Sequence, residues 1–138
     1  MFVTTTDYKV VIGAAALAVV TQTDQANREN AEKEAVEEIS GYLRPQYDCE
    51  AIFSATGDER NSQMVMFTCD IALYHMTAST SRGMGSDVRK ERYERAIKWL
   101  ESVQAGKIRP ELPTATNEQG EEIVRTHYGS APQLKSIW

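Results

Sequence analysis

The sequence predicts a mainly α-helical protein: a bundle of three long helices, short helices before it and an extended C-terminal arm after it. Apolar residues recur at three- and four-residue steps through most of the first 106 residues. Glycines and prolines fall between these periodic segments. The three longest segments each span about 18–20 residues, or roughly 27–30 Å, and matched lengths suit side-by-side packing. We therefore expect a helical domain over residues 1–106 and an arm over residues 107–138.

Two short helices are expected at the start of the chain. The threonines at 4–6 can cap a helix that includes Asp7 and stops near Gly13, and residues 14–20 form a second one. Both would lie over the bundle as a lid. The longest apolar run, residues 10–20, is too short to cross a bilayer, which takes about 20 residues. We therefore expect no membrane span.

The first long helix is expected to start after Asp24 and to end before Pro45, which cannot supply a backbone donor. Ala31, Ala35 and Ile39 repeat at helical spacing on its apolar side. Its acids outnumber its bases by four, which predicts a solvated face, a surface that repels phosphate, or one that meets a basic neighbour. The acids are Asp24, Glu29, Glu32, Glu34, Glu37 and Glu38, and the bases are Arg28 and Lys33.

Residues 46–58 are predicted to be a loop, and Asp58 or Asn61 can cap the helix that follows to about residue 80. Apolar residues cover most of the circumference of this helix, which places it at the centre of the bundle. Asp70 in its middle needs a partner there, because an unpaired buried charge is costly. It is either a catalytic acid or a carboxylate held by a base or hydroxyl, such as Arg95, Lys98 or a tyrosine.

No catalytic constellation accompanies Asp70. Cys69 and His75 are six residues apart, about 240° around a helix, and no third metal ligand stands near them. His127 has no companion, and the segment 83–85 lacks the third glycine of a dinucleotide loop. The sequence therefore predicts no catalytic, cofactor or metal site, and a protein that is not an enzyme.

A connector over residues 79–86 leads to the last long helix, which Ser86 or Asp87 caps and Gly106 closes. This helix carries more bases than acids, opposite in sign to the first long helix. Opposite-charge faces of neighbouring copies could therefore pair around a ring. Trp99 at the edge of its stripe is either a core-edge residue or a subunit contact. The interface candidates are Glu34, Glu38, Arg89, Arg92, Arg95 and Trp99.

The arm has a different pattern, because Pro110 and Pro113 break helical structure. Residues 117–120 are turn-like between two short apolar segments, 114–116 and 123–125, which allows a short β-hairpin. Such a polar arm needs a partner to hold it. The side chains expected to anchor it to that partner are Tyr128, Leu134, Ile137 and Trp138.

The overall charge limits the partners further. The chain carries 15 Lys and Arg against 20 Asp and Glu, a net charge of −5. This argues against a free-standing binder of nucleic acid, which needs a basic face. The two cysteines, Cys49 and Cys69, are too few for a disulfide scaffold, so a reducing compartment is expected.

Three segments in order resemble one known family: residues 39–48, with Ile-Ser-Gly-Tyr-Leu and Tyr-Asp; residues 69–74, Cys-Asp-Ile-Ala-Leu-Tyr; and residues 92–108, with Arg-Tyr-Glu-Arg-Ala-Ile-Lys-Trp-Leu and Ala-Gly-Lys-Ile. Together they resemble the small neck proteins of Mu-like tailed phages, over about residues 2–110. The positions that carry the motifs are Gly41, Tyr42, Leu43, Tyr47, Asp48, Asp70, Tyr93, Leu100 and Gly106.

The resemblance implies a structural head-to-tail connector, or adaptor. Such a subunit forms a ring, a dodecamer in this family, beneath the portal protein, joins the capsid to tail or neck proteins, and lets DNA pass without reading its sequence. It would lie in the neck of the virion, and in the cytoplasm of the host bacterium during assembly. The family supplies no catalytic residue. Residues 48–60 and the longer arm depart from the family pattern, so their contacts stay open.

Two other functions fit the sequence. One is a tail-completion or terminator protein on the tail side of the neck, which would crosslink to tube subunits instead of the portal. The other is a small helical regulator that binds DNA or a host protein; it would show a basic recognition face and salt-sensitive binding to duplex DNA. The acidic balance of the chain disfavours the regulator.

Overall fold

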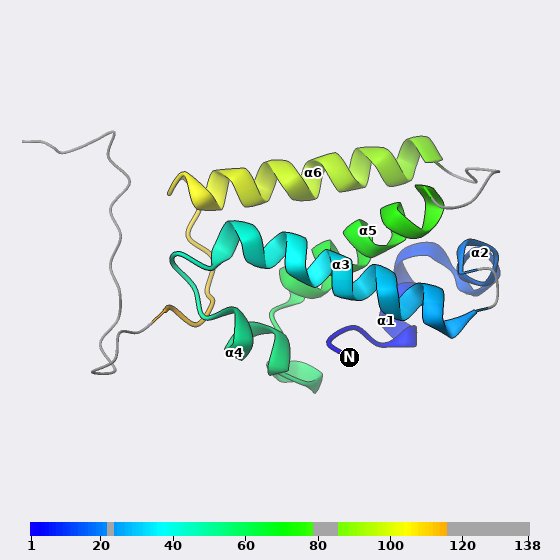
Figure 1. Cartoon of the computed structure of the whole chain (residues 1–138), viewed down its shortest axis with the longest axis horizontal. Coiled ribbons are helices and arrows are strands. Elements are labelled where there is room, and N and C mark those ends of the chain that lie inside the picture. The colour runs from blue at the N-terminus through cyan, green and yellow to red at the C-terminus, as the bar shows by residue number, and fades with distance from the viewer. Residues whose placement is uncertain (22–23, 79–85, 116–138) are drawn as a thin grey trace, which may run out of the picture.

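Three long helices form the predicted bundle, and shorter helices cover it (Figure 1). The computed structural model describes residues 1–21, 24–78 and 86–115. None of the helices in these ranges is long and apolar enough to span a membrane. The protein is mainly α-helical, as predicted. Its elements are α1 (Thr5–Ile12), α2 (Ala14–Val20), α3 (Gln25–Leu43), α4 (Cys49–Ser54), the 3-10 turn η1 (Gly57–Glu59), α5 (Ser62–Ala78) and α6 (Ser86–Gln104).

Helix α5 is the centre of the bundle because it is apolar on nearly every side. It contacts α1, α2, α3 and α6. Met64 and Ile71 on α5 are completely buried, and so are Ile39 of α3 and Leu100 of α6. The apolar periodicity of the sequence therefore identified the core correctly.

Helices α1 and α2 form the predicted lid at one side of α5. Helix α1 begins with a capping box, in which Thr4 Oγ1 accepts a hydrogen bond from the Asp7 N–H and the Asp7 carboxylate accepts one from the Thr4 N–H. Gly13 joins α1 to α2 with a φ of +88°, a conformation that favours glycine. Val3 and Tyr8 are buried beneath the lid, so the first residues of the chain belong to the core.

Helices α3 and α6 end at the positions that Pro45 and Gly106 indicated in the sequence. The Arg44 N–H still donates to the Ser40 carbonyl, but Pro45 has no N–H to continue α3. At the end of α6, Gly106 adopts a φ of +80°. The Gly106 N–H donates to the Val103 carbonyl, and the Lys107 N–H donates to the Ser102 carbonyl, which is the pattern of a Schellman cap.

The predicted loop over residues 46–58 was wrong, because it contains α4 and η1. The Asp48 side chain caps α4 by accepting from the Ala51 N–H at 3.1 Å, and Ile52 packs into the core. A helix of six residues is too short to produce a recognisable apolar period in the sequence. Of the two caps predicted for α5, the structure uses Asn61, whose Oδ1 accepts from the Met64 N–H.

The first part of the arm, residues 107–115, lies against the domain. Thr114 forms an isolated antiparallel bridge with Tyr47, and the Ala115 N–H donates to the Gln46 carbonyl. Ile108 and Leu112 pack against the core. In the predicted hairpin, 114–116 pairs with 123–125; Thr114 pairs instead with Tyr47, and 123–125 lie outside the described residues, as does the connector over 79–85.

Candidate functional site

Asp70 and Arg92 form an ion pair between α5 and α6. Arg92 Nε donates to Asp70 Oδ1 at 2.6 Å, and Asp70 is only 3% exposed. The partner of Asp70 is therefore Arg92, not Arg95, Lys98 or a tyrosine. Because Asp70 holds an arginine from the neighbouring helix, it fixes the register of α5 against α6. The Arg92 side chain remains 28% exposed, so one side of the pair is accessible from outside.

Arg89 lies one turn before Arg92 on α6 and is only 7% exposed. Its Nη1 is buried and has no hydrogen-bond partner in the part of the chain that the structure describes. Burial of the guanidinium, together with the nearby charge of Arg92, lowers the pKa of Arg89, and the attraction of Asp70 only partly opposes this. The two guanidinium groups of Arg89 and Arg92 thus interact electrostatically with one buried carboxylate, and these three side chains carry an excess positive charge.

Glu38 links three helices within one subunit. Its carboxylate accepts a hydrogen bond from Tyr93 Oη of α6 at 2.5 Å and contacts His75 Nε2 of α5 at 3.0 Å. Tyr93 also stacks on Tyr74, with ring centroids 4.2 Å apart. Burial and the Glu38 carboxylate both raise the pKa of Tyr93, so the phenol stays protonated and keeps donating.

The remaining predicted interface residues lie nearer the surface. Glu34 on α3 is exposed. Arg95 is exposed as well and lies 3.6 Å from Glu91 on its own helix. Trp99 is half-buried and packs on Phe67 with ring centroids 4.9 Å apart. The subunit-interface roles of Glu34, Arg95 and Trp99 stay predictions.

A groove of about 360 Å³ opens between α1, α5 and α6, and Arg92 forms part of its wall. Its apolar side includes Val10, which is 82% exposed, an unusual exposure for an aliphatic side chain on a helix. The groove thus combines aliphatic surface with a guanidinium. The lining residues are Asp7, Val10, Val11, Ser62, Val65, Met66, Cys69 and Arg92.

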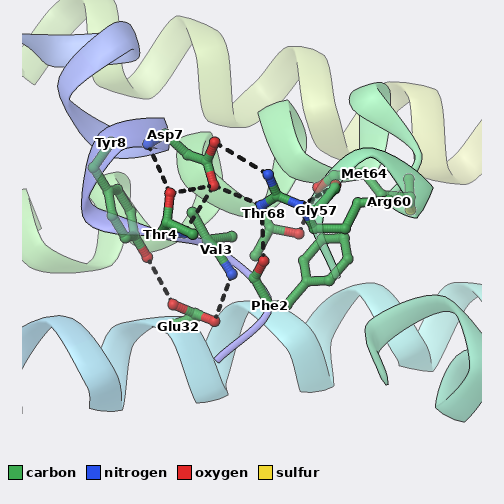
Figure 2. Close-up of polar contacts among 10 residues, drawn as sticks. All are labelled: Phe2, Val3, Thr4, Asp7, Tyr8, Glu32, Gly57, Arg60, Met64 and Thr68. Carbon is green, nitrogen blue, oxygen red and sulfur yellow. Dashed lines mark hydrogen bonds and ion pairs between the residues drawn. The ribbon is translucent and has the colours of Figure 1, made fainter. Parts of the chain in front are cut away.

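Polar contacts hold α1, and so one wall of this groove, in place (Figure 2). Arg60 donates to the Asp7 carboxylate at 2.6 Å and to the Phe2 carbonyl at 2.9 Å. On the other side, Glu32 of α3 accepts from the Val3 N–H and the Tyr8 hydroxyl. Burial raises the pKa of Glu32.

Glu32 corrects the prediction that the acids of α3 form a solvated face. It is 2% exposed, because it lies beside Ala31 and Ala35 on the side of α3 that the first residues of the chain cover. Glu38 is half-buried because it faces α5 and α6, where it contacts His75 and Tyr93. The acidic surface of α3 is therefore smaller than the sequence suggested.

The residues that carried the family resemblance divide between core and chain turns. Leu43, Tyr47 and Leu100 are buried, Tyr42 is half-buried, and Gly41 lies exposed with open space where a Cβ would project. Asp48 caps the start of α4, and Gly106 closes the end of α6. The predicted arm anchors lie outside the described residues: Tyr128, Leu134, Ile137 and Trp138.

The titratable side chains of the described residues do not gather into a recognisable metal site. Among the described residues, no group of three or more His, Cys, Asp or Glu side chains could hold a metal ion. Cys49 and Cys69 are both free thiols. Burial raises the pKa of each, so neither is an activated thiolate.

The fold and these surfaces define a small helical-bundle protein in which polar contacts such as Asp70–Arg92 and Glu38–Tyr93 link neighbouring helices. A family model described as Bacteriophage Mu, Gp36 matches residues 2–126, and the chain belongs to this family. The match confirms the resemblance to a Mu-like phage protein and extends it beyond residue 110. No curated protein and no solved structure matches the chain significantly.

Proposed function

We propose that this chain is a structural head-to-tail connector subunit of a tailed phage, and not an enzyme. It would form a ring, a dodecamer, beneath the portal protein and join the capsid to tail or neck proteins. The observation that carries the proposal is the family match over residues 2–126, together with the ordered motifs that resemble Mu-like neck proteins.

The charge of the chain supports this role. A connector must let DNA slide through its lumen, and a surface without strong basic patches binds phosphate weakly. The net charge is −5, and the buried guanidinium of Arg89 and the Asp70-paired Arg92 are withdrawn from the basic side of α6. Copies of such a chain repel one another, so a ring needs apolar burial and matched charges at each interface.

The arm supplies a means of docking to the portal or to a neck protein. Four large apolar side chains lie near its end: Tyr128, Leu134, Ile137 and Trp138. Such residues are typical anchors at protein interfaces. On this proposal the bundle forms the wall of the ring and the arm holds it to a neighbour.

Purified virions test the proposal. Antibody labelling should place the chain at the neck, and crosslinking should join it to the portal protein. A virion whose neck lacks the chain would refute the proposal. Crosslinks to tube subunits alone would identify a tail-completion protein instead.

A further inference from the structure

The Asp70 cluster lacks one negative charge. Arg92 Nε donates to the Asp70 carboxylate at 2.6 Å, while Arg89 is buried and its Nη1 has no partner among the described residues. A buried charge without a partner destabilises a fold, so a sequence that places one there gains little unless an anion arrives later. One additional carboxylate would balance the two guanidinium groups.

The groove between α1, α5 and α6 gives that carboxylate a route. Arg92 is the member of the cluster that lines it, and Arg92 is also the more exposed of the two arginines. A carboxylate on the other nitrogens of Arg92 would add a negative charge beside the two guanidinium groups. Val10, Val65 and Met66 on the same walls would receive aliphatic side chains. The groove therefore fits a segment with an acid directly before aliphatic residues.

The arm of this protein contains such a segment. Residues 121–124 are Glu-Glu-Ile-Val, two carboxylates followed by two β-branched aliphatic residues. The family match reaches residue 126 and so includes this segment. Six residues of extended chain from Ala115 to Glu121 span about 20 Å, enough to reach a molecule in contact with the first.

The ring of the proposed function favours a second copy as the acceptor. Ala115 lies beside Gln46, at the α4 end of the bundle, whereas α1 and α2 lie toward the other end (Figure 1). An arm that leaves one subunit and enters a groove on the next subunit makes a heterologous contact, the type that closes rings.

We propose that residues 121–124 of one copy dock in the α1/α5/α6 groove of the next copy. A carboxylate of Glu121 or Glu122 binds Arg92, and Ile123 and Val124 pack against Val10 and Val65. This inference rests on the ring assembly of the proposed function. It assigns the segment before Tyr128 to the neighbouring subunit and leaves the last residues for another partner.

Disulfide trapping between two single-cysteine additions tests the contact. The full chain carrying Val10→Cys is mixed with the full chain carrying Ile123→Cys, alone and with the portal protein, under mild oxidation. Val10 is 82% exposed, so its replacement leaves the packed interior unchanged. The wild-type chain, which keeps Cys49 and Cys69, gives the background, and circular dichroism checks each fold.

We expect a disulfide-linked pair in the mixture. Adding Glu121→Gln and Glu122→Gln to the donor chain should slow its formation about tenfold or more, as for loss of a charge-assisted hydrogen bond. Glu118→Gln in the same arm is the matched control and should leave the rate unchanged. Arg92→Gln in the acceptor should slow the reaction similarly, and Lys98→Gln, which changes an exposed cation on the same helix, should not.

Three results would overturn the inference. The first is the absence of a disulfide-linked pair both with and without portal protein. The second is a rate of linkage that the two glutamate changes leave unaltered. The third is a chain carrying both Val10→Cys and Ile123→Cys that forms the disulfide only within itself. A chain found in the neck without the linked pair would refute this contact and leave the connector function intact. A linked pair in a protein absent from the neck would refute the function instead.

Discussion

Replacing Arg89 by methionine should stabilise the isolated subunit. Methionine keeps an unbranched buried side chain and removes the guanidinium, of which Nη1 is buried without a partner among the described residues. A buried donor left unsatisfied costs about 1–3 kcal/mol. The attraction between Arg89 and Asp70 is lost as well, but so is the repulsion from Arg92. We expect the free energy of unfolding to rise by about 1 kcal/mol.

Urea unfolding of the monomer, followed by far-ultraviolet circular dichroism, measures this change. The matched control is Arg95→Met, because Arg95 is an exposed cation on the same helix and its loss should change stability by no more than about 0.5 kcal/mol. If Arg89→Met instead lowered the free energy of unfolding by more than about 1 kcal/mol, Arg89 would be a net stabilising partner of Asp70 and the charge argument would be wrong.

Three further predictions follow from the core, the α1 contacts and the arm. Leu100→Ala should lower the free energy of unfolding by about 2–5 kcal/mol in urea, because Leu100 is completely buried; a loss below about 1 kcal/mol contradicts its place in the core. Burial alone would raise the pKa of Asp7, but hydrogen bonds from Arg60 and Thr4 lower it overall. Stability should therefore fall as the pH drops below 3.8, the ordinary pKa of this carboxyl, toward its lower pKa in the folded state. The fall should be smaller in Asp7→Asn when both proteins are titrated. Deleting residues 129–138 should leave the urea midpoint unchanged and abolish portal binding in pull-down; a collapse in stability would place these residues in the subunit core.

The long helices could be predicted because local rules determine them. The repeat of Ala31, Ala35 and Ile39 on α3 and the break at Pro45 need no knowledge of the rest of the chain. The same holds for the glycine that closes α6 at position 106. Helix existence and core face were therefore readable from the sequence, and helix ends were accurate to within about two residues.

The buried polar partners could not be predicted, because they depend on the register between helices. Asp70 needed a base, but the sequence offered several on α6, and only the relative position of α5 and α6 selects Arg92. The sequence does not distinguish Glu32 from the other acids of α3, because its burial depends on contact with the first residues of the chain. Arg60 gave no signal at all, since its partner Asp7 is 53 residues away.

The surfaces were predicted less well than the core. Of six interface candidates, Glu38, Arg89 and Arg92 are already engaged or buried within one subunit, so charge sign alone overestimated the exposed surface. The groove beside Arg92 was missed because it gathers Val10, Val65 and Arg92 from three separate helices. The one indication of the groove in the sequence was Val10, an aliphatic residue on a short helix for which the sequence suggested no packing partner.

Size-exclusion chromatography with mass detection tests the connector role most directly. The purified chain is run alone and then mixed with the portal protein of the same phage. If the chain is a connector, we expect a complex that contains both proteins, or a ring of the chain alone whose mass is a multiple of 15.5 kDa. A chain that stays at 15.5 kDa and never co-elutes with portal would contradict it.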